Sequence, residues 1–386
     1  MSTLSLARDF RYRAPAQTFE VPGVGTLRMH DVGMADAREE LLDFYARSYR
    51  PGYILGNEAL FNWMFKHNGG HVAVLSLGER IIAHQGHVPV VFSDGVSDVR
   101  GSISASTMVD GSYRRLGLMT RLRGNVQDRY EMAVSLGGST RGIALYTSMG
   151  YRYLGDLVRL IALVNPERSR AVSQGGERCK PSVPLFRGLS GVEPIERFAA
   201  LGGELRTLWD RTFPPGSWFG VKRDAEFLDW RYREHPLFAY QRFGLRRHGA
   251  LSAVVVFRKE RVSGSIANVI RLVEAFGERE ALIELVRGTV LSEAVAHDVA
   301  WVDWFCSNRT LCGHLAAAGF QTPEELAPAR FPIFTSPVDY YKTTYPFMFW
   351  SADERRYETL PPFSEWYITK GDGDADRPND ATGRHD

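Results

Sequence analysis

A turn rich in hydrogen-bond donors, with Arg114, Arg115 and Gly117, separates a strand pattern from a helix pattern in the first half of the chain. Before it, apolar and polar residues alternate from Val99 to Val109, which is the period of a β-strand with one apolar and one polar face. After it, apolar residues recur on one helical stripe at Leu118, Met119, Leu122 and Val126. Such a turn presents unpaired amides and the positive end of a helix dipole. It therefore predicts a binding site for a polyanion such as a pyrophosphate.

This turn resembles the acyl-CoA-binding signature of the GNAT acyltransferases, V-x-P-x-Y-R-x-x-G-x-[GA]. Four signature residues match, namely Val109, Tyr113, Arg114 and Gly117, while glycine replaces the proline and methionine replaces the last small residue. The resemblance implies an acyl-CoA co-substrate, with its pyrophosphate on the backbone of the turn and its pantetheine arm along the strand end. The residues implied in this binding are Thr107, Met108, Val109, Arg114, Arg115, Leu116, Gly117, Leu118 and Met119.

A second part of the same family pattern follows further along the chain. A strand pattern from Met132 to Leu136 precedes a glycine break and a short helix pattern that Gly150 closes. In the GNAT family the segment A-x-Y-x-x-x-G-[FY] carries a tyrosine that protonates the departing CoA thiolate, and Tyr146 holds that place. A phenol, with a reference pKa of about 10, can hydrogen-bond a thiolate at physiological pH. Tyr146 is thus a candidate catalytic acid, and the alternative is a tyrosine at the edge of the core.

Acyl transfer to an amine also needs a group that accepts a proton from an ammonium acceptor. His84 and His87 lie three residues apart in a strand pattern, so they point to opposite faces and at most one lines the cleft. Histidine has a suitable pKa range, although either residue can equally be a hydrogen-bonded strand residue. Asp303 is the second candidate, because a carboxylate among apolar strand residues needs a reason. We take His84 and Asp303 as the candidate bases.

The bulk composition is that of an ordinary globular protein. The chain has 386 residues with 47 basic and 45 acidic side chains, a net charge of +2, so no nucleic-acid partner is indicated. Three cysteines, no apolar leader and no apolar run of membrane-spanning length lead us to expect a cytoplasmic protein without membrane insertion. The cysteine and histidine spacings do not make a zinc site, and we expect no metal. The oligomeric state stays open.

Two copies of one unit follow each other in the chain. The stretch around Trp63 aligns with the stretch around Trp230, and Gly150 aligns with Gly319. We therefore expect an α/β fold of tandem GNAT-like domains, in each of which helices flank a mixed (α+β) central sheet. The expected boundaries are 1–165 for the N-terminal, acyl-CoA-binding domain, 166–185 for a linker, 186–369 for the C-terminal domain and 370–386 for an acidic tail.

The second copy lacks the features that carry the chemistry in the first. Its long strand pattern leads into Phe276-Gly277-Glu278-Arg279-Glu280, which has no R-x-x-G turn and places two acids where a pyrophosphate would lie. The counterpart of Tyr146 is Leu315, which has no proton to donate. We therefore expect a degenerate second copy that shapes the acceptor pocket.

Two further stretches point to the acceptor. A W-R-Y-x-x-x-P element from Trp230 to Pro236 and a D-x-D-R-P-N ending resemble tandem GNAT proteins of polysaccharide and nucleotide-sugar pathways. The resemblance implies an amino-sugar acceptor, contacted by Arg231, Arg233, Asp374 and Arg377. The alternatives are a core role and a disordered acidic tail. Trp230 and Tyr232 cannot share a helix face, so we expect one of them, Trp230, in the core.

We therefore expect an acyl-CoA-dependent N-acyltransferase that moves an acyl group, such as the acetyl group of acetyl-CoA, to the amine of a small-molecule acceptor. This acceptor is an amino-sugar, in nucleotide-linked form. One alternative is an acyltransferase that acts on a protein or aminoacyl amine. The other is a non-catalytic CoA-binding module. The acyl chain length and the acceptor stay open at this stage.

Overall fold

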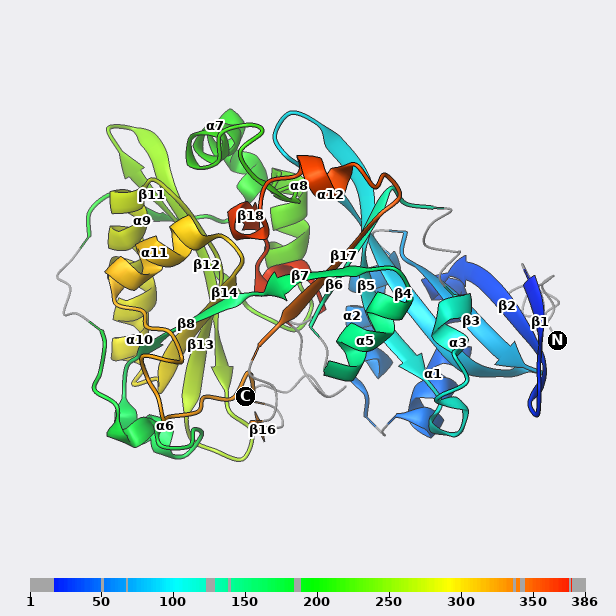
Figure 1. The fold of residues 1–386 in the computed structure, drawn as a ribbon. Helices are drawn as coiled ribbons and strands as arrows, with labels where there is room; N and C mark the ends of the chain where they lie inside the picture. Colours follow the sequence, from blue (N-terminus) through cyan, green and yellow to red (C-terminus); the bar gives the residue numbers. More distant parts are fainter. Residues whose placement is uncertain are drawn as a thin grey trace, which may run out of the picture.

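A computed structural model describes residues 17–49, 52–66, 69–122, 129–137, 140–183, 189–335, 338–340, 344–374 and 376. Figure 1 shows two halves that lie side by side. The elements of the first are β1 (Gln17–Val21), β2 (Gly25–Gly33), α1 (Arg38–Ser48), α2 (Glu58–Phe61), β3 (His71–Leu77), β4 (Arg80–Ser93), β5 (Asp98–Val109), α3 (Leu118–Arg121), β6 (Met132–Leu136), α5 (Thr140–Ser148) and β7 (Arg152–Asp156).

The remaining elements run from the middle of the chain to its end. They are β8 (Val158–Leu163), α6 (Pro166–Arg170), β9 (Val192–Pro194), α7 (Gly203–Thr212), β10 (Phe219–Val221), α8 (Ala225–Leu228), β11 (Gln241–Arg247), β12 (Ala250–Arg261), β13 (Asn268–Gly277), α9 (Arg279–Leu285), α10 (Ser292–Ala296), β14 (Trp301–Cys306), α11 (Arg309–Ala318), β15 (Phe334–Thr335), β16 (Val338–Asp339), β17 (Pro346–Ser351), α12 (Arg356–Thr359) and β18 (Trp366–Tyr367).

Each half is built on a mixed sheet, as predicted. The first has the main order β1-β2-β3-β4-β5-β6-β17-β7. Outside this order, β10 pairs with β4 on one side and with β18 on the other. The second has the order β8-β14-β13-β12-β11-β9. In both, the long strand runs parallel to the next strand of its copy, β5 to β6 and β13 to β14, whereas the neighbouring pairs of the same copy are antiparallel.

The two halves exchange strands. β8 follows β7 directly in the chain but pairs with β14 in the second sheet, whereas β17, from the end of the chain, lies between β6 and β7 in the first. Figure 1 shows these long segments crossing between the halves. The two sheets are therefore interlocked by backbone hydrogen bonds and do not depend on side-chain contacts alone.

Turn and cap residues repeat between the copies. The β3–β4 hairpin has Gly78 at a φ of 60°, and the β11–β12 hairpin has His248 and Gly249 at φ of 52° and 80°. Two-residue hairpin loops need this left-handed backbone because its twist matches that of the strands. Gly150 and Gly319, at φ of 88° and 116°, follow α5 and α11, where a glycine ends a helix without strain.

The aligned tryptophans form the pseudo-symmetric contact between the two copies. Trp63 and Trp230 lie in short π-helical turns, Asn62–Lys66 and Asp229–Arg233, that follow α2 and α8. Their rings stack at 5.0 Å, and each indole N–H donates to the backbone carbonyl of the other residue, at 2.9 and 3.2 Å. The internal alignment made from sequence thus corresponds to a direct contact.

One expectation about side-chain burial is wrong. Tyr232 is buried as well as Trp230, because their turn lies between two hydrophobic clusters, one from each half. The polar face of β5 is also buried, since Ser102, Ser104 and Ser106 lie inside the protein and not in solvent. Strand β5 therefore has covered faces on both sides, and its serines are available for internal hydrogen bonds.

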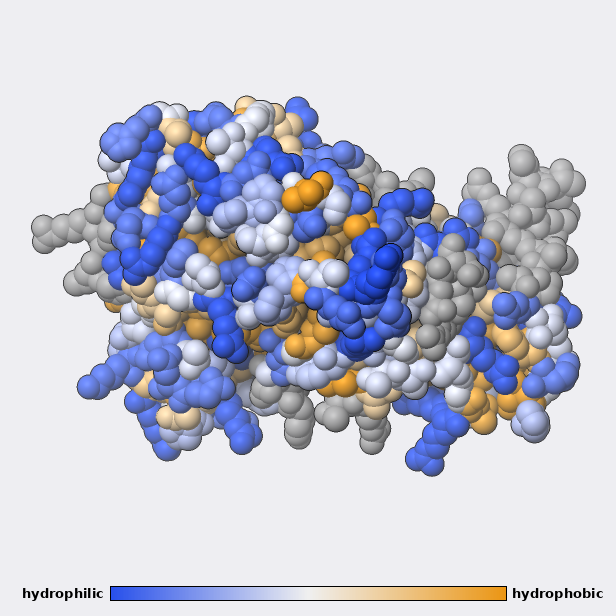
Figure 2. All heavy atoms as spheres, turned by 45° about the horizontal axis from the view of Figure 1, so that its top comes forward, coloured by the Kyte–Doolittle hydropathy of each residue, from blue (hydrophilic) through white to orange (hydrophobic). Residues whose placement is uncertain are grey.

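Figure 2 shows mainly hydrophilic residues over one face of the molecule, with hydrophobic residues visible near its middle and at its right-hand end. The buried apolar residues form separate clusters on the two faces of the first sheet and a larger cluster in the second half. Within the described ranges, no helix is both long and apolar enough to cross a membrane.

One candidate base, the histidine at position 84, is buried among aromatic rings. His84 on β4 is fully buried, and its ring lies 5.1 Å from Phe44 and 5.3 Å from Tyr45. Neither ring nitrogen has a hydrogen-bond partner among the described residues. Burial lowers the pKa of His84 to about 3, so the ring is neutral in the folded protein at neutral pH.

We expect Trp63→Phe and Trp230→Phe each to lower the free energy of unfolding by about 1 kcal/mol, because each loses an N–H donor and packing area. The double variant should lose less than the sum, by at least about 0.5 kcal/mol, because the two rings contact each other. Urea unfolding followed by circular dichroism measures all four proteins. Strict additivity would contradict an energetic coupling between the copies.

We expect the free energy of unfolding to fall as the pH drops below 6.5, because the unfolded chain then protonates His84 while the folded protein does not. The effect is about 1.4 kcal/mol per pH unit until the folded pKa of about 3 is reached. His84→Phe should flatten this dependence by about that slope. Urea unfolding between pH 7 and pH 5 tests it, and an unchanged slope in the variant would contradict it.

Candidate active site

The donor-rich turn begins where β5 ends. A short 3₁₀ turn, Gly111–Tyr113, leads to Arg115 and Gly117, whose φ values of 77° and 65° are both left-handed, and then to α3. Residues Arg114 to Gly117 are exposed. Across the described parts of the chain, none of the amides from Arg114 to Met119 has a hydrogen-bond acceptor. Left-handed residues in such a turn direct neighbouring amides into a concavity that suits an anion.

Asp110 fixes the start of the turn. Its backbone N–H donates to Ile82 O at 2.8 Å, and its carboxylate accepts from Ser112 N at 3.0 Å and Ser48 Oγ at 2.8 Å. Burial would raise the pKa of Asp110, but these hydrogen bonds and the nearby charges of Arg80 and Arg47 together lower it. The ionised carboxylate therefore holds the turn to α1 and to β4.

A β-bulge brings the strand end close to Tyr146. The register of β4 and β5 shifts between His84 and Gly86, and Ser106 opposite has a φ of 55°. Its hydroxyl lies 3.1 Å from Tyr45 Oη. A bulge reorients the residues that follow it, and here Thr107 Oγ1 lies 3.0 Å from Tyr146 Oη.

Tyr146 is a buried phenol in a cluster of hydroxyl groups. Burial raises its pKa, hydrogen bonds with Ser135, Thr107 and Ser104 oppose this rise, and the charge of Asp374 adds to it. The phenol is therefore protonated at physiological pH and can act as a hydrogen-bond donor. Ser104 and Ser135 were missed from sequence, although the serines that recur at every second position of the β5 pattern gave a signal for Ser104.

The two candidate bases lie in environments that differ from that of this cluster. His84 is enclosed by the aromatic rings described above. Asp303, on β14, is buried between Arg159 Nη2, at 3.0 Å, and the guanidinium of Arg271. The reason for its carboxylate among apolar strand residues is thus this pair of arginines. The role of proton acceptor stays a prediction for both residues.

At the equivalent place in the second copy, the backbone after the long strand is hydrogen-bonded and closely packed. The amide of Glu278 donates to Ser252 O at 2.9 Å, and α9 begins at the next residue. A side chain at Gly277 would collide with Ala253, so the strand end is pressed against β12. Leu315 is fully buried in the apolar cluster of this half. These contacts fit the expectation that the copy is degenerate.

The four predicted acceptor residues are distributed as follows. Arg231 is buried, donates to Gly373 O at 2.9 Å, and lies over the Trp63 ring at 5.1 Å. Arg233 is partly exposed and donates to Glu234 at 2.7 Å. Asp374 is half-buried, whereas Arg377 lies outside the described residues.

Arg231 and Asp374 share a small cavity between the halves. Its lining includes Ile103 and Ala105 from β5 and Trp230 from the second copy. The volume is ≈ 20 Å³, which is about the space that one water molecule needs. The structure thus brings Arg231 and Asp374 together and leaves Arg233 at the surface.

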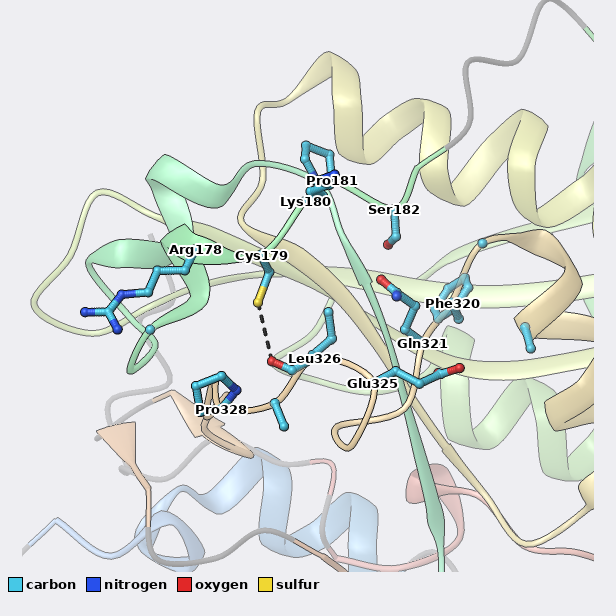
Figure 3. Close-up of a pocket in the computed structure, with 14 residues that line it drawn as sticks. Arg178, Cys179, Lys180, Pro181, Ser182, Phe320, Gln321, Glu325, Leu326 and Pro328 are labelled. Atoms are coloured by element: carbon cyan, nitrogen blue, oxygen red, sulfur yellow. Dashed lines mark hydrogen bonds between the residues drawn. The ribbon is translucent and has the colours of Figure 1, made fainter.

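A wider pocket lies in the second half, where the linker predicted at residues 166–185 meets the loop after α11 (Figure 3). Its volume is ≈ 660 Å³, and Cys179 Sγ donates to Leu326 O there at 3.4 Å. Burial, followed by the charge of Glu177, raises the pKa of the Cys179 thiol. The thiol is therefore protonated at neutral pH and is a poor nucleophile.

No protein-family model matches the chain, and no curated protein matches its sequence. Solved structures do resemble it. N-myristoyltransferase of Saccharomyces cerevisiae with bound myristoyl-CoA superposes with a TM-score of 0.56 at 11% identity, over 88% of this chain and 86% of that one. A probable N-acyltransferase of unknown function from Enterococcus faecalis gives 0.54 at 13%, over 84% and 72%.

A GCN5-related N-acetyltransferase from Anabaena variabilis also matches, with a TM-score of 0.51 at 12% identity, over 84% of this chain and 73% of that one. At such identities the likeness concerns the fold. Together with the two mixed sheets, it confirms the expected α/β fold of tandem GNAT-like halves.

Proposed function

We propose that the protein is an acyl-CoA-dependent N-acyltransferase whose first half binds the acyl-CoA. The observation that carries the proposal is the turn from Arg114 to Met119, exposed as far as Gly117 and with uncommitted amides, at the end of a bulged strand whose Thr107 contacts Tyr146. A structural neighbour that holds myristoyl-CoA supports an acyl-CoA as co-substrate.

In this proposal the pyrophosphate of CoA binds the amides of the turn, and Arg114 and Arg115 add positive charge. The pantetheine arm lies along Thr107 to Val109, so that the thioester reaches the bulge. The departing sulfur then meets the hydroxyl of Tyr146, which is held protonated by its burial. A preorganised donor at the leaving group lowers the barrier to breaking the carbon–sulfur bond.

For the acceptor we propose an amino-sugar, in nucleotide-linked form, bound where the two halves meet. Arg231 and Asp374 line one cavity there, and Arg233 lies nearby in the sequence at the protein surface. Guanidinium groups suit a phosphate, aromatic rings suit a sugar, and a carboxylate suits an ammonium group. Arg377 follows Asp374 closely in the chain and completes the proposed set.

We expect Tyr146→Phe to lower kcat about 100-fold without changing the dissociation constant of CoA, because only the proton donor is removed. Tyr151→Phe is the matched control, since Tyr151 is a buried tyrosine whose ring lies 5.0 Å from that of Tyr146. Release of CoA thiol from acetyl-CoA with amino-sugar nucleotides measures kcat. An unchanged kcat in Tyr146→Phe would exclude a catalytic role for Tyr146. A wild-type protein that binds CoA but shows no turnover would favour a non-catalytic CoA-binding module.

We expect Leu116→Glu to weaken CoA binding at least about tenfold, because it places a carboxylate beside the proposed pyrophosphate site. Leu116 is 39% exposed, so the protein should keep its melting temperature. Leu116→Gln is the control of nearly equal shape without charge. Calorimetric titration with CoA compares the three proteins, and equal affinities would show that the pyrophosphate binds elsewhere.

A further inference from the structure

The last described segment of the chain, residues 366–374 together with Asp376, lies in the opening of the second sheet, and we call it the C-terminal strap. Ile368 O accepts from Ser307 N at 3.0 Å, next to the end of β14. Tyr367 Oη accepts from Ala275 N at 3.3 Å, on β13. The strap therefore contacts both strands that border this opening and closes it.

Two buried arginines of the second half anchor the strap through alternate aspartates. Arg223 Nη2 donates to Asp372 Oδ2 at 2.7 Å, and Arg258 Nη2 donates to Asp376 Oδ1 at 2.7 Å. Tyr240 Oη donates to Asp376 Oδ2 at 2.6 Å. All these groups are buried, and buried carboxylates with such charged donors hold a fixed position.

The close fit of the strap's backbone adds to this anchoring. A side chain at Gly371 would collide with Tyr232 Oη, which itself donates to the buried Glu274 at 2.7 Å. A side chain at Gly373 would meet Leu136, on β6 of the first half, at 3.2 Å. The strap therefore contacts both halves within these few residues.

Asp374, between these two aspartates, lies beside residues of the first half. It lines the cavity next to Ile103 and Ala105 of β5. Its charge also contributes to the raised pKa of Tyr146. Of the three alternate aspartates, the outer two thus bind arginines of the second half, and the middle one lines the cavity between the halves.

We propose that Arg223 and Arg258 are positioning residues, so that the second half acts as a clamp on the strap. They hold Asp374 in a place where its carboxylate binds the ammonium group of the acceptor and takes a proton from it. This inference rests on the proposed N-acyltransferase function. The acceptor class is accordingly a primary amine that is protonated at neutral pH.

The proton and electron movements balance. The acceptor ammonium gives one proton to Asp374, and the nitrogen lone pair forms a bond to the thioester carbonyl carbon. The carbon–sulfur bond breaks, and its electron pair goes to sulfur. The proton that the nitrogen loses on becoming an amide reaches the sulfur through the Tyr146 hydroxyl. Asp374 releases its proton to solvent, which leaves the amide, CoA thiol and one proton.

The test compares acceptors that differ in charge, with acetyl-CoA as donor and CoA thiol release as readout. Glucosamine, its nucleotide-linked form and ethylamine are cationic at neutral pH, whereas hydroxylamine is uncharged. We expect Asp374→Asn to lower kcat/KM about 100-fold for the cationic amines and less than about twofold for hydroxylamine. Asp374→Glu should restore part of the loss. Calorimetric titration should show unchanged CoA affinity in both variants.

The clamp is tested with Arg258→Lys, which keeps the charge but loses the two-pronged contact with Asp376. We expect kcat/KM for the cationic amines to fall about tenfold, with no change for hydroxylamine. Arg246→Lys is the control, because Arg246 binds Glu193 at 2.7 Å at the partly exposed surface of the same sheet. Should Arg258→Lys not fold, the Asp374 variants decide the inference.

The outcomes separate this inference from the proposed function. Equal losses for charged and uncharged acceptors in Asp374→Asn would overturn the role of Asp374 and leave the acyltransferase intact. A wild-type protein that acylates hydroxylamine but none of the cationic amines would also overturn the role of Asp374 and leave the acyltransferase function intact. A wild-type protein that neither binds CoA nor acylates any of the four acceptors would overturn the proposed function and, with it, this inference.

Discussion

A buried guanidinium needs a carboxylate within contact distance, and this requirement determines where the end of the chain lies. In the second half Arg223 and Arg258 are fully enclosed, and their carboxylate partners include Asp372 and Asp376 of the C-terminal strap. Removing the strap would leave these cations buried with fewer carboxylate partners, so the strap is part of the core. Because the strap also reaches Leu136 in the first half, the buried charges of one copy hold a segment that contacts the other.

The two copies share one arrangement of strands and helices but use it for different purposes. Both have a long strand followed by a parallel strand, and both end a short helix with a left-handed glycine. In the first copy the strand ends in an exposed turn with uncommitted amides, whereas in the second Glu278 is bonded to Ser252 and the opening is filled by the strap. Strand exchange through β8 and β17 makes the halves inseparable, and the stacked Trp63 and Trp230 join their equivalent turns.

Much of this arrangement could be predicted from the sequence, because local patterns encode it. Alternation predicted β5, glycine at the helix end predicted the close of α5, and the internal alignment paired the two tryptophans that stack. The burial of Tyr232 and of the β5 serines could not be predicted, since it depends on which elements cover both sides of a strand or turn. The partners of Asp303 were hidden for a similar reason: Arg159 and Arg271 lie on other strands, and only the order of the sheet brings them together.

The sequence by itself determined the repeat, the order of strands and helices, the donor-rich turn and the tyrosine that follows it, because each depends on residues close together in the chain. Only the tertiary structure decided that Asp372 and Asp376 bind buried arginines and that Asp374 lines the cavity between the halves. In a regular extended segment three alternate aspartates would lie on one side, but residues Lys370–Asp372 form a 3₁₀ turn and each aspartate meets different neighbours. The position of Asp374 beside Ile103 and Ala105 therefore follows from how the two copies interlock.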